Sequence, residues 1–187
     1  MRAMAAAAPN TLVGLRDRAL LLLGFAGALR RSELVALDVD DLEEAEGGLC
    51  IRIVRSKTDQ EGQGAVIAIL PGAIACPIKS VKAWLTAAKI TDGPVFRPIV
   101  KGGRMTSDRL SDKSAVDIIK RYAQCIGLDA KSVAEHSLRA GFLTSAAAGG
   151  ATIFKMMDVS RHRSVDPLRG YIRDAELFRD HAGTGLL

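Results

Sequence analysis

Residues 16–42 read RDRALLLLGFAGALRRSELVALDVDDL, and this stretch decides how the sequence folds. Its apolar run, residues 19–29, is about half as long as a membrane-spanning helix requires. Because apolar side chains occur almost all round a helix here, we predict a buried core helix over residues 11–29. A short second helix over residues 32–37 is expected to end at the acidic turn of residues 38–41.

The rest of the chain predicts one hairpin and several further helices. Two segments rich in isoleucine and valine, residues 49–55 and 64–70, flank a polar turn and predict two antiparallel strands. Helical patterns cover residues 77–89, 111–126, 136–148, 152–159 and 167–172. We therefore predict a mainly α fold with a small antiparallel β-sheet, an α+β class. Residues 11–187 are expected to form one domain, and the Ala-rich residues 1–10 a loose leader or linker remnant.

Bulk properties narrow the class of function. The formal net charge of +5 suits a polyanionic partner, and the 4% of aromatic residues indicates contact through charge rather than base stacking. Cys50, Cys76 and Cys125 are far apart and lack metal-ligand spacing, so we expect a reducing cytoplasm, no structural zinc and no disulfide scaffold. No targeting segment is recognised.

Six chemistry-bearing side chains are spread along the chain: Arg30, Lys57, His136, Arg139, His162 and Tyr171. Taken singly, each is more often structural, since arginines at helix junctions are usually ion-paired and tyrosines near amphipathic helices usually pack. Together they supply what cleavage of a phosphodiester without a metal requires: a nucleophile, cations for the phosphoryl oxygens and an acid for the leaving oxygen. Guanidiniums suit the non-bridging oxygens because each is a planar fork of donors.

The order and spacing of these residues resemble the tyrosine recombinase (phage integrase) family. Residues 16–42 resemble the segment around that family's first catalytic arginine, where a long apolar helix ends in a turn of the form GLRxSEL. HSLR resembles the family's HxxR motif. Arg139 and His162 are 23 residues apart, and His162 and Tyr171 nine, which are the family's usual intervals. The resemblance covers nearly the whole chain and implies the tyrosine recombinase catalytic-domain fold.

The resemblance also implies roles for the arginines, the second histidine and the tyrosine. Arg30 and Arg139 would clamp the scissile phosphate, and His162 would hydrogen-bond to it. Tyr171 would attack and form a 3′-phosphotyrosyl link. Because that link stores the energy of the broken bond, rejoining would need neither ATP nor a metal. Glu33 matches an acidic position beside the first arginine and is expected to support it.

Proton transfer is assigned less directly. The resemblance makes Lys57, in the hairpin turn, the general acid for the departing 5′ oxygen, although Lys79 or Lys101 could substitute. His136 would act as base or proton shuttle. No cofactor is implied.

Some positions depart from the family's pattern. Ser160-Arg161-His162 stands where LGH is common, and Ala28 stands where glycine is frequent. No reactive group is lost by these changes, so activity in site-specific recombination is the favoured hypothesis. A type IB topoisomerase that relaxes DNA, and a DNA-binding relic or regulator that no longer cuts, are the alternatives.

The resemblance also implies partners. We expect double-stranded DNA, a homotetramer on that DNA, and residues 174–187 docking in trans on a neighbouring protomer; the same segment could instead fold onto its own domain. Cytoplasmic, nucleoid-associated localisation would follow. Family members usually carry an N-terminal core-binding domain that completes a clamp around DNA, and this chain is expected to lack it. DNA binding by the chain alone should then be weak and salt-sensitive.

Overall fold

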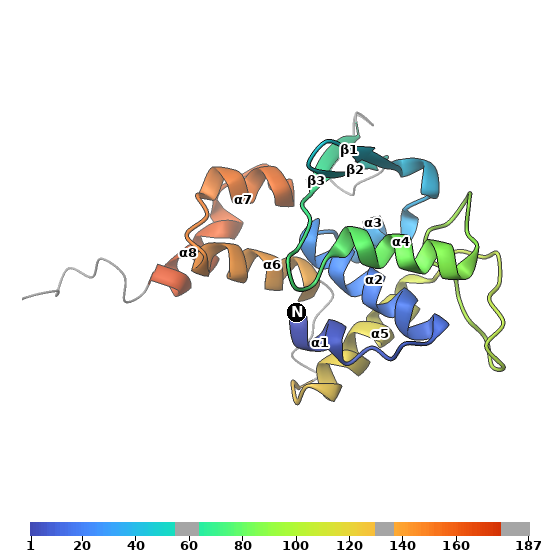
Figure 1. The fold of residues 1–187 in the computed structure, drawn as a ribbon. Helices are drawn as coiled ribbons and strands as arrows, with labels where there is room; N and C mark the ends of the chain where they lie inside the picture. Colours follow the sequence, from blue (N-terminus) through green and yellow to red (C-terminus); the bar gives the residue numbers. More distant parts are fainter. Residues whose placement is uncertain (55–63, 130–136, 177–187) are drawn as a thin grey trace, which may run out of the picture.

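The computed structural model describes residues 1–54, 64–129 and 137–176 (Figure 1). In these ranges the elements are, in order, α1 (Arg2–Ala6), α2 (Leu12–Ala26), α3 (Arg31–Ala36), the 3-10 turn η1 (Val39–Asp41), β1 (Leu42–Ala45), β2 (Gly48–Ile53), β3 (Ala65–Ile69), α4 (Pro77–Ala88), α5 (Asp112–Cys125), α6 (Ser137–Ala148), α7 (Ile153–Ser160) and α8 (Asp166–Glu176). The predicted fold class, mainly α with a small antiparallel sheet, is confirmed.

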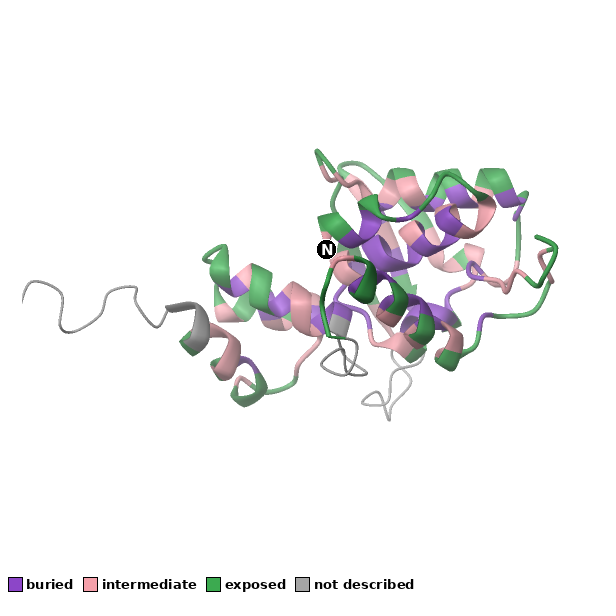
Figure 2. Ribbon diagram, turned by 90° about the horizontal axis from the view of Figure 1, so that it is seen from below, coloured by how far each residue is buried: buried purple, intermediate pink, exposed green. Residues whose placement is uncertain are grey.

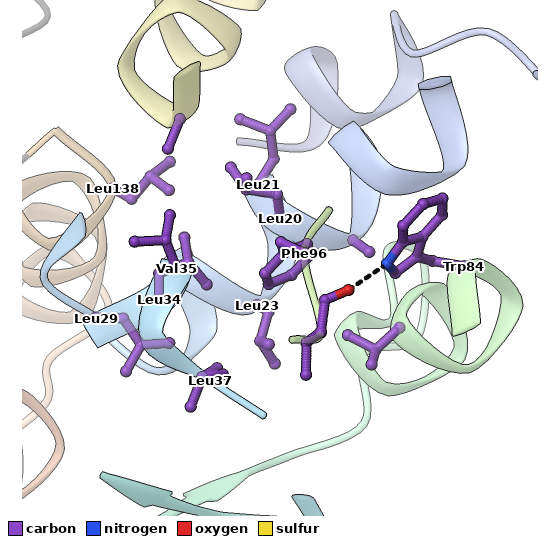
Figure 3. Close-up of a cluster of buried hydrophobic side chains, with 14 of the residues drawn as sticks. Leu20, Leu21, Leu23, Leu29, Leu34, Val35, Leu37, Trp84, Phe96 and Leu138 are labelled. Carbon is purple, nitrogen blue, oxygen red and sulfur yellow. Dashed lines mark hydrogen bonds between the residues drawn. The ribbon is translucent and has the colours of Figure 1, made fainter. Parts of the chain in front are cut away.

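Helix α2 forms the centre of the main core. Its first turn is capped by the Thr11 hydroxyl, which accepts a hydrogen bond from the Gly14 N–H at 3.2 Å. Beyond this cap its leucines are buried on several sides, as the unbroken apolar run predicted. Figure 3 shows them near side chains of α3 and α6, near Trp84 of α4, and near Phe96. The Trp84 indole N–H is satisfied by the Val95 carbonyl at 2.8 Å, so this polar group is buried without loss.

A buried polar network joins α2 to α5. Asp17 is fully buried and accepts two hydrogen bonds from the Arg16 guanidinium, at 2.8 and 2.9 Å. Its other oxygen accepts from Arg121 and, at 3.1 Å, from the Tyr122 hydroxyl. These donors offset the high cost of removing a carboxylate from water.

The sheet has the order β1-β2-β3 and is antiparallel throughout. In β2 and β3 the side chains alternate, so that Ile51 and its cross-strand partner Ile67 face the core while Arg52 and Val66 face outward. The two predicted strands are confirmed. Strand β1 was not predicted, because its sequence LEEA is short and charged and lacks the β-branched residues that indicate strands.

The N-terminal segment, residues 1–10, is packed rather than loose, which corrects the prediction. Met4 and Ala8 are buried in the main core, and the Arg18 Nε donates to the Ala5 carbonyl at 3.1 Å. Because alanine supplies little contrast between a buried and an exposed face, the sequence pattern of this segment gave no sign of its helix α1.

The molecule divides into a body, formed by α1–α5 and the sheet, and a C-terminal unit, formed by α6–α8 at one side of it (Figure 1). The C-terminal unit has its own small buried cluster, while α6 also reaches the body through Leu138. Gly24 of α2 permits this approach, since a Cβ there would lie 2.6 Å from the Leu138 side chain. An edge-to-face contact between Phe25 and Phe142, with ring centroids 5.9 Å apart, adds to the junction. Figure 2 shows buried residues concentrated in the body.

The helices of the described ranges are all too short or too polar to cross a bilayer.

Candidate active site

The turn between α2 and α3 lies at the centre of the site. Gly27 ends α2, and a Cβ on it would lie 2.9 Å from the end of the Ile67 side chain, so glycine lets the turn pack closely against β3 without moving that side chain. The next residue, Ala28, is buried and has a φ of +43°. This left-handed conformation is disfavoured for alanine and would suit glycine better.

Arg30 is held in place by Glu33 on the first turn of α3. The Glu33 Oε2 accepts the Arg30 backbone N–H at 2.8 Å, and its Oε1 accepts from the Arg30 Nη1 at 2.7 Å. Glu33 is 2% exposed, so the ion pair operates in a site from which water is largely excluded. These contacts are those that the predicted support of Arg30 by Glu33 requires, and the catalytic role of the pair stays a prediction. The carboxylate fixes both the backbone and the guanidinium of Arg30.

Arg139, on α6, is turned toward the same α2–α3 turn. Its Nη1 donates to the Ala28 carbonyl at 2.9 Å, and its Nη2 lies 3.4 and 3.5 Å from the two ring nitrogens of His162. The pKa of Arg139 is lowered to about 10, chiefly by burial and then by the neighbouring Arg30 and Arg161 guanidiniums. It remains charged at neutral pH, and the C-terminal unit therefore supplies a second cation aimed at the site.

His162 follows α7 and is oriented by Ser160. The Ser160 hydroxyl donates to the Met156 carbonyl at 2.5 Å and lies 2.7 Å from the His162 Nδ1. Because this hydroxyl has one proton, it accepts from Nδ1–H, which leaves Nε2 as the acceptor facing Arg139. Burial, followed by repulsion from Arg139 and other nearby arginines, lowers the pKa of His162 to about 4. The ring is therefore neutral at pH 7 in the ligand-free protein.

Tyr171, on α8, lies half-buried against the small cluster of the C-terminal unit. Its phenol is close enough to the Arg139 guanidinium to raise the pKa of that arginine, against the stronger effects that lower it. The structure thus brings four of the predicted residues to one place: Arg30, Arg139, His162 and Tyr171. Lys57 and His136 lie outside the described residues. Of the two substitutes for Lys57, Lys79 lines a separate cavity beside α1 and α2.

Two residues of the site were not predicted. Ser160 orients His162, and Arg161 donates to the Glu33 Oε2 at 2.5 Å. The sequence signalled both only as a departure from the usual small residues before the histidine. Burial lowers the pKa of Arg161, and Glu33 opposes that shift. Among the described residues no group of three or more His, Cys, Asp or Glu side chains is placed to hold a metal ion.

This chain belongs to the phage integrase family, which it matches over residues 1–177. It is 44% identical over 173 residues to an integrase/recombinase xerD homolog of Selenomonas ruminantium, covering 91% of this chain and 51% of that protein. It is 32% identical to the tyrosine recombinase XerC of Pelotomaculum thermopropionicum, covering 89% of this chain and 50% of the relative. The chain thus spans about half the length of these curated relatives.

Solved structures show the same fold. The XerH site-specific recombinase bound to a palindromic difH substrate, in a post-cleavage complex, superimposes with a TM-score of 0.77 at 16% identity, over 98% of this chain and 49% of that one. The XerA recombinase superimposes with a TM-score of 0.69 at 20% identity, over 96% of this chain and 61% of that one. At these identities the likeness concerns the fold alone.

Proposed function

We propose that this chain is the catalytic part of a site-specific tyrosine recombinase, which cuts and rejoins DNA through a 3′-phosphotyrosyl intermediate on Tyr171. The observation that carries the proposal is the convergence of Arg30, Arg139 and His162 around the α2–α3 turn, with the Tyr171 phenol near Arg139. Relatives named as recombinases and integrases support it. The sequence and the fold also suit DNA rejoining in integration, the activity after which the family is named.

In the proposed reaction the two arginines bind the non-bridging oxygens of the scissile phosphate. The Tyr171 oxygen forms a bond to phosphorus, its proton passes to His136, and the bond from phosphorus to the 5′ oxygen breaks. Lys57 supplies the proton that the departing 5′ oxygen needs. Attack by another 5′ hydroxyl on the phosphotyrosine reverses these transfers, so that the number of high-energy bonds is unchanged and no ATP is consumed.

His162 would respond to the bound phosphate. In the ligand-free site its pKa is held near 4 by burial and by the surrounding arginines. A phosphate between those arginines adds negative charge and raises the pKa of the imidazole. The Nε2 atom, which is an acceptor in the empty site, could then carry a proton and donate to a non-bridging oxygen. His162 would thus add a hydrogen bond when substrate is present.

Covalent trapping tests the proposal. Nicked duplexes of partly random sequence, which lose the 5′ fragment after cleavage, are incubated with the protein and resolved by denaturing electrophoresis. We expect a protein–DNA adduct for the wild type and none for Tyr171→Phe, because the variant lacks the attacking oxygen. No adduct from the wild type, even with an N-terminal partner domain supplied, would support a non-cutting DNA-binding relic.

Tyr122, the chain's second tyrosine, makes the test clear. It is 4% exposed, its hydroxyl donates to the buried Asp17, and burial together with that carboxylate raises its pKa. It is therefore poorly suited to attack phosphorus, and Tyr122→Phe should still form the adduct.

A type IB topoisomerase would also form a covalent adduct, so relaxation of a plasmid that lacks a recombination site is measured in parallel. Relaxation alone would favour that alternative.

Double-stranded DNA is the proposed partner, and an assembly of four protomers the proposed active form. Residues 174–187 would dock on a neighbouring protomer in that assembly, and a DNA substrate would place the protein in the cytoplasm with the nucleoid.

The chain alone should bind DNA weakly, with an affinity that falls as salt is raised. Nanomolar, sequence-specific binding at physiological salt would contradict this expectation. Size-exclusion chromatography of DNA complexes, with and without residues 174–187, tests the docking.

A further inference from the structure

Arg161 occupies a backbone position that favours glycine. It ends α7 with φ +56° and ψ +41°, the left-handed conformation in which side chains with a Cβ are disfavoured. An arginine that accepts this strain must gain something from its side chain.

The side chain of Arg161 makes contacts that glycine could not. Its Nη2 donates to the Glu33 Oε2 at 2.5 Å, and its Nη1 donates to the carbonyls of Val159 at 3.0 Å and Gly27 at 3.3 Å. The side chain is 13% exposed and that of Glu33 1% exposed, so this ion pair is shielded from water. The left-handed turn thus directs Arg161 back into the body, while its neighbour His162 faces Arg139.

These contacts cross from the C-terminal unit to the body. Glu33 lies on the first turn of α3 and Gly27 ends α2, whereas Arg161 belongs to the unit that also carries His162 and Tyr171. Glu33 is at the same time bound to Arg30 through both of its oxygens. One buried carboxylate is therefore shared by two guanidiniums that come from opposite sides of the site.

The pairing of Arg161 with Glu33 makes the net charge of the site more positive. Three guanidiniums, those of Arg30, Arg139 and Arg161, stand against the single carboxylate of Glu33. A phosphodiester carries one negative charge and gains further negative charge on its oxygens as a nucleophile attacks. Fixed positive charge in a site shielded from water favours such a transition state over the ground state. Without Arg161, the charge of Glu33 would be set against the guanidiniums of Arg30 and Arg139 only.

We propose that Arg161 is a positioning residue for strand cleavage: it shares the carboxylate of Glu33, and so keeps Arg30 oriented and the site cationic while joining the C-terminal unit to the body. This inference rests on the proposed function. It assigns no contact between Arg161 and the phosphate. It therefore predicts a loss of cleavage rate rather than of DNA affinity, because affinity is spread over many phosphate contacts.

The test compares single-turnover cleavage of the nicked substrate at saturating DNA. We expect Arg161→Gln to cleave about 10–100-fold more slowly, with DNA affinity within about threefold of wild type. Arg163 is exposed and two residues away, so Arg163→Gln is a matched control for loss of one positive charge and should cleave normally. Arg161→Gly suits the left-handed backbone and should fold with normal thermal stability but cleave as slowly as Arg161→Gln.

A double variant distinguishes action through Glu33 from a purely structural role. Glu33→Gln alone should also slow cleavage, because Arg30 then loses the carboxylate that orients it. If Arg161 acts through Glu33, adding Arg161→Gln to Glu33→Gln should slow cleavage by no more than about threefold further. A double variant in which the two losses multiply in full overturns the proposal, as does wild-type cleavage by Arg161→Gln itself.

The proposed function and this inference can fail separately. If the wild type forms no adduct, the proposed function fails, and the role of Arg161 is judged from binding of inorganic phosphate, followed by NMR of the His162 ring. We expect Arg161→Gln to bind phosphate about tenfold more weakly than wild type, and the double variant with Glu33→Gln to bind it within about threefold of Glu33→Gln alone. Equal phosphate affinity in wild type and Arg161→Gln would then overturn the inference.

Discussion

The body and the C-terminal unit differ in how much buried apolar surface holds each together. The body's cluster draws on helices, the sheet and the loop that carries Phe96, with Trp84 among its largest buried side chains. In the C-terminal unit, the buried cluster within the described residues consists of Leu143, Ala147, Met156 and Leu168. Since stability grows with buried area, the C-terminal unit depends on its junction with the body.

This difference coincides with the division of the site. Arg30 and Glu33 stand on the body, whereas His162 and Tyr171 stand on the C-terminal unit. Regions with few buried apolar contacts open locally at a lower free energy than the core of the same protein. The C-terminal unit, which can open more easily, therefore carries Arg139, His162 and Tyr171, whereas Arg30 stands on the body. The following predictions test this comparison.

The largest effect is expected from breaking the buried network of the body. Asp17→Asn removes a charge on which the 6%-exposed Arg16 depends, and we expect a loss of about 3–5 kcal/mol in the free energy of unfolding. The loss should appear in the whole molecule, measured by denaturant unfolding. Asp117→Asn, an exposed position on α5, is the matched control and should change stability little. A change of under 1 kcal/mol for Asp17→Asn would contradict the assigned network.

A smaller and local effect is expected in the C-terminal unit. Leu168 is fully buried in the small cluster, and Leu168→Ala should cost about 2–4 kcal/mol through lost contacts and a cavity. Amide hydrogen exchange should become faster in α7 and α8 while α2 and α4 keep their protection. Leu168→Met retains the volume and should leave exchange nearly unchanged. Equally faster exchange in both regions would show that the whole molecule opens as a single cooperative unit.

The pH dependence of stability should reveal His162. Its pKa is lowered to about 4 in the folded protein from an ordinary value of 6.5, so between these values the unfolded chain binds more protons. Stability attributable to this ring is therefore complete above about pH 6.5 and is lost as pH falls toward 4. We expect a loss of about 1–2 kcal/mol, since solvent screens this partly exposed group. The difference between wild type and His162→Asn isolates it, and a pH-independent difference would contradict the shift.

The smallest effect concerns the α2–α3 turn of the body, which Arg139 and Arg161 of the C-terminal unit contact. Ala28 has a φ of +43°, which costs about 1–2 kcal/mol for a residue with a Cβ, whereas glycine loses about 0.5–1 kcal/mol more in backbone entropy on folding. Ala28→Gly should therefore stabilise the protein by about 0.5 kcal/mol, measured by thermal unfolding. A destabilisation of 1 kcal/mol or more would show that the methyl group contributes packing that outweighs the strain.

The sequence predicted the elements whose local signal is strong. An unbroken apolar run predicted α2, and alternating β-branched residues predicted β2 and β3, all of which are confirmed. It missed β1 and the packing of residues 1–10, where charge or alanine conceals the pattern. Local patterns report the period of a helix or strand, and these two segments owe their structure to neighbours instead.

The candidate site shows the same limit at longer range. Motif spacing predicted Arg30, Arg139, His162 and Tyr171, which the structure brings together; their catalytic roles stay predictions, as do those of Lys57 and His136. Arg161 could not be predicted, because its partner Glu33 lies 128 residues away in the sequence. The charged Arg161 in place of a small residue indicated a departure from the family's pattern, but it did not indicate what the side chain contacts.

The anchoring of Arg30 and Arg139 has a stereochemical consequence for the proposed phosphate site. Arg139 is tied by one arm to the Ala28 carbonyl, and Arg30 is tied to Glu33, so each guanidinium presents a fixed edge from a different side. The two non-bridging oxygens of a phosphodiester in nucleic acid are not interchangeable, since the sugars around them are chiral. Because the two guanidiniums approach from fixed and different directions, the protein would distinguish one non-bridging oxygen from the other. Replacing one non-bridging oxygen by sulfur should therefore change the rate of the proposed cleavage by a different amount from replacing the other.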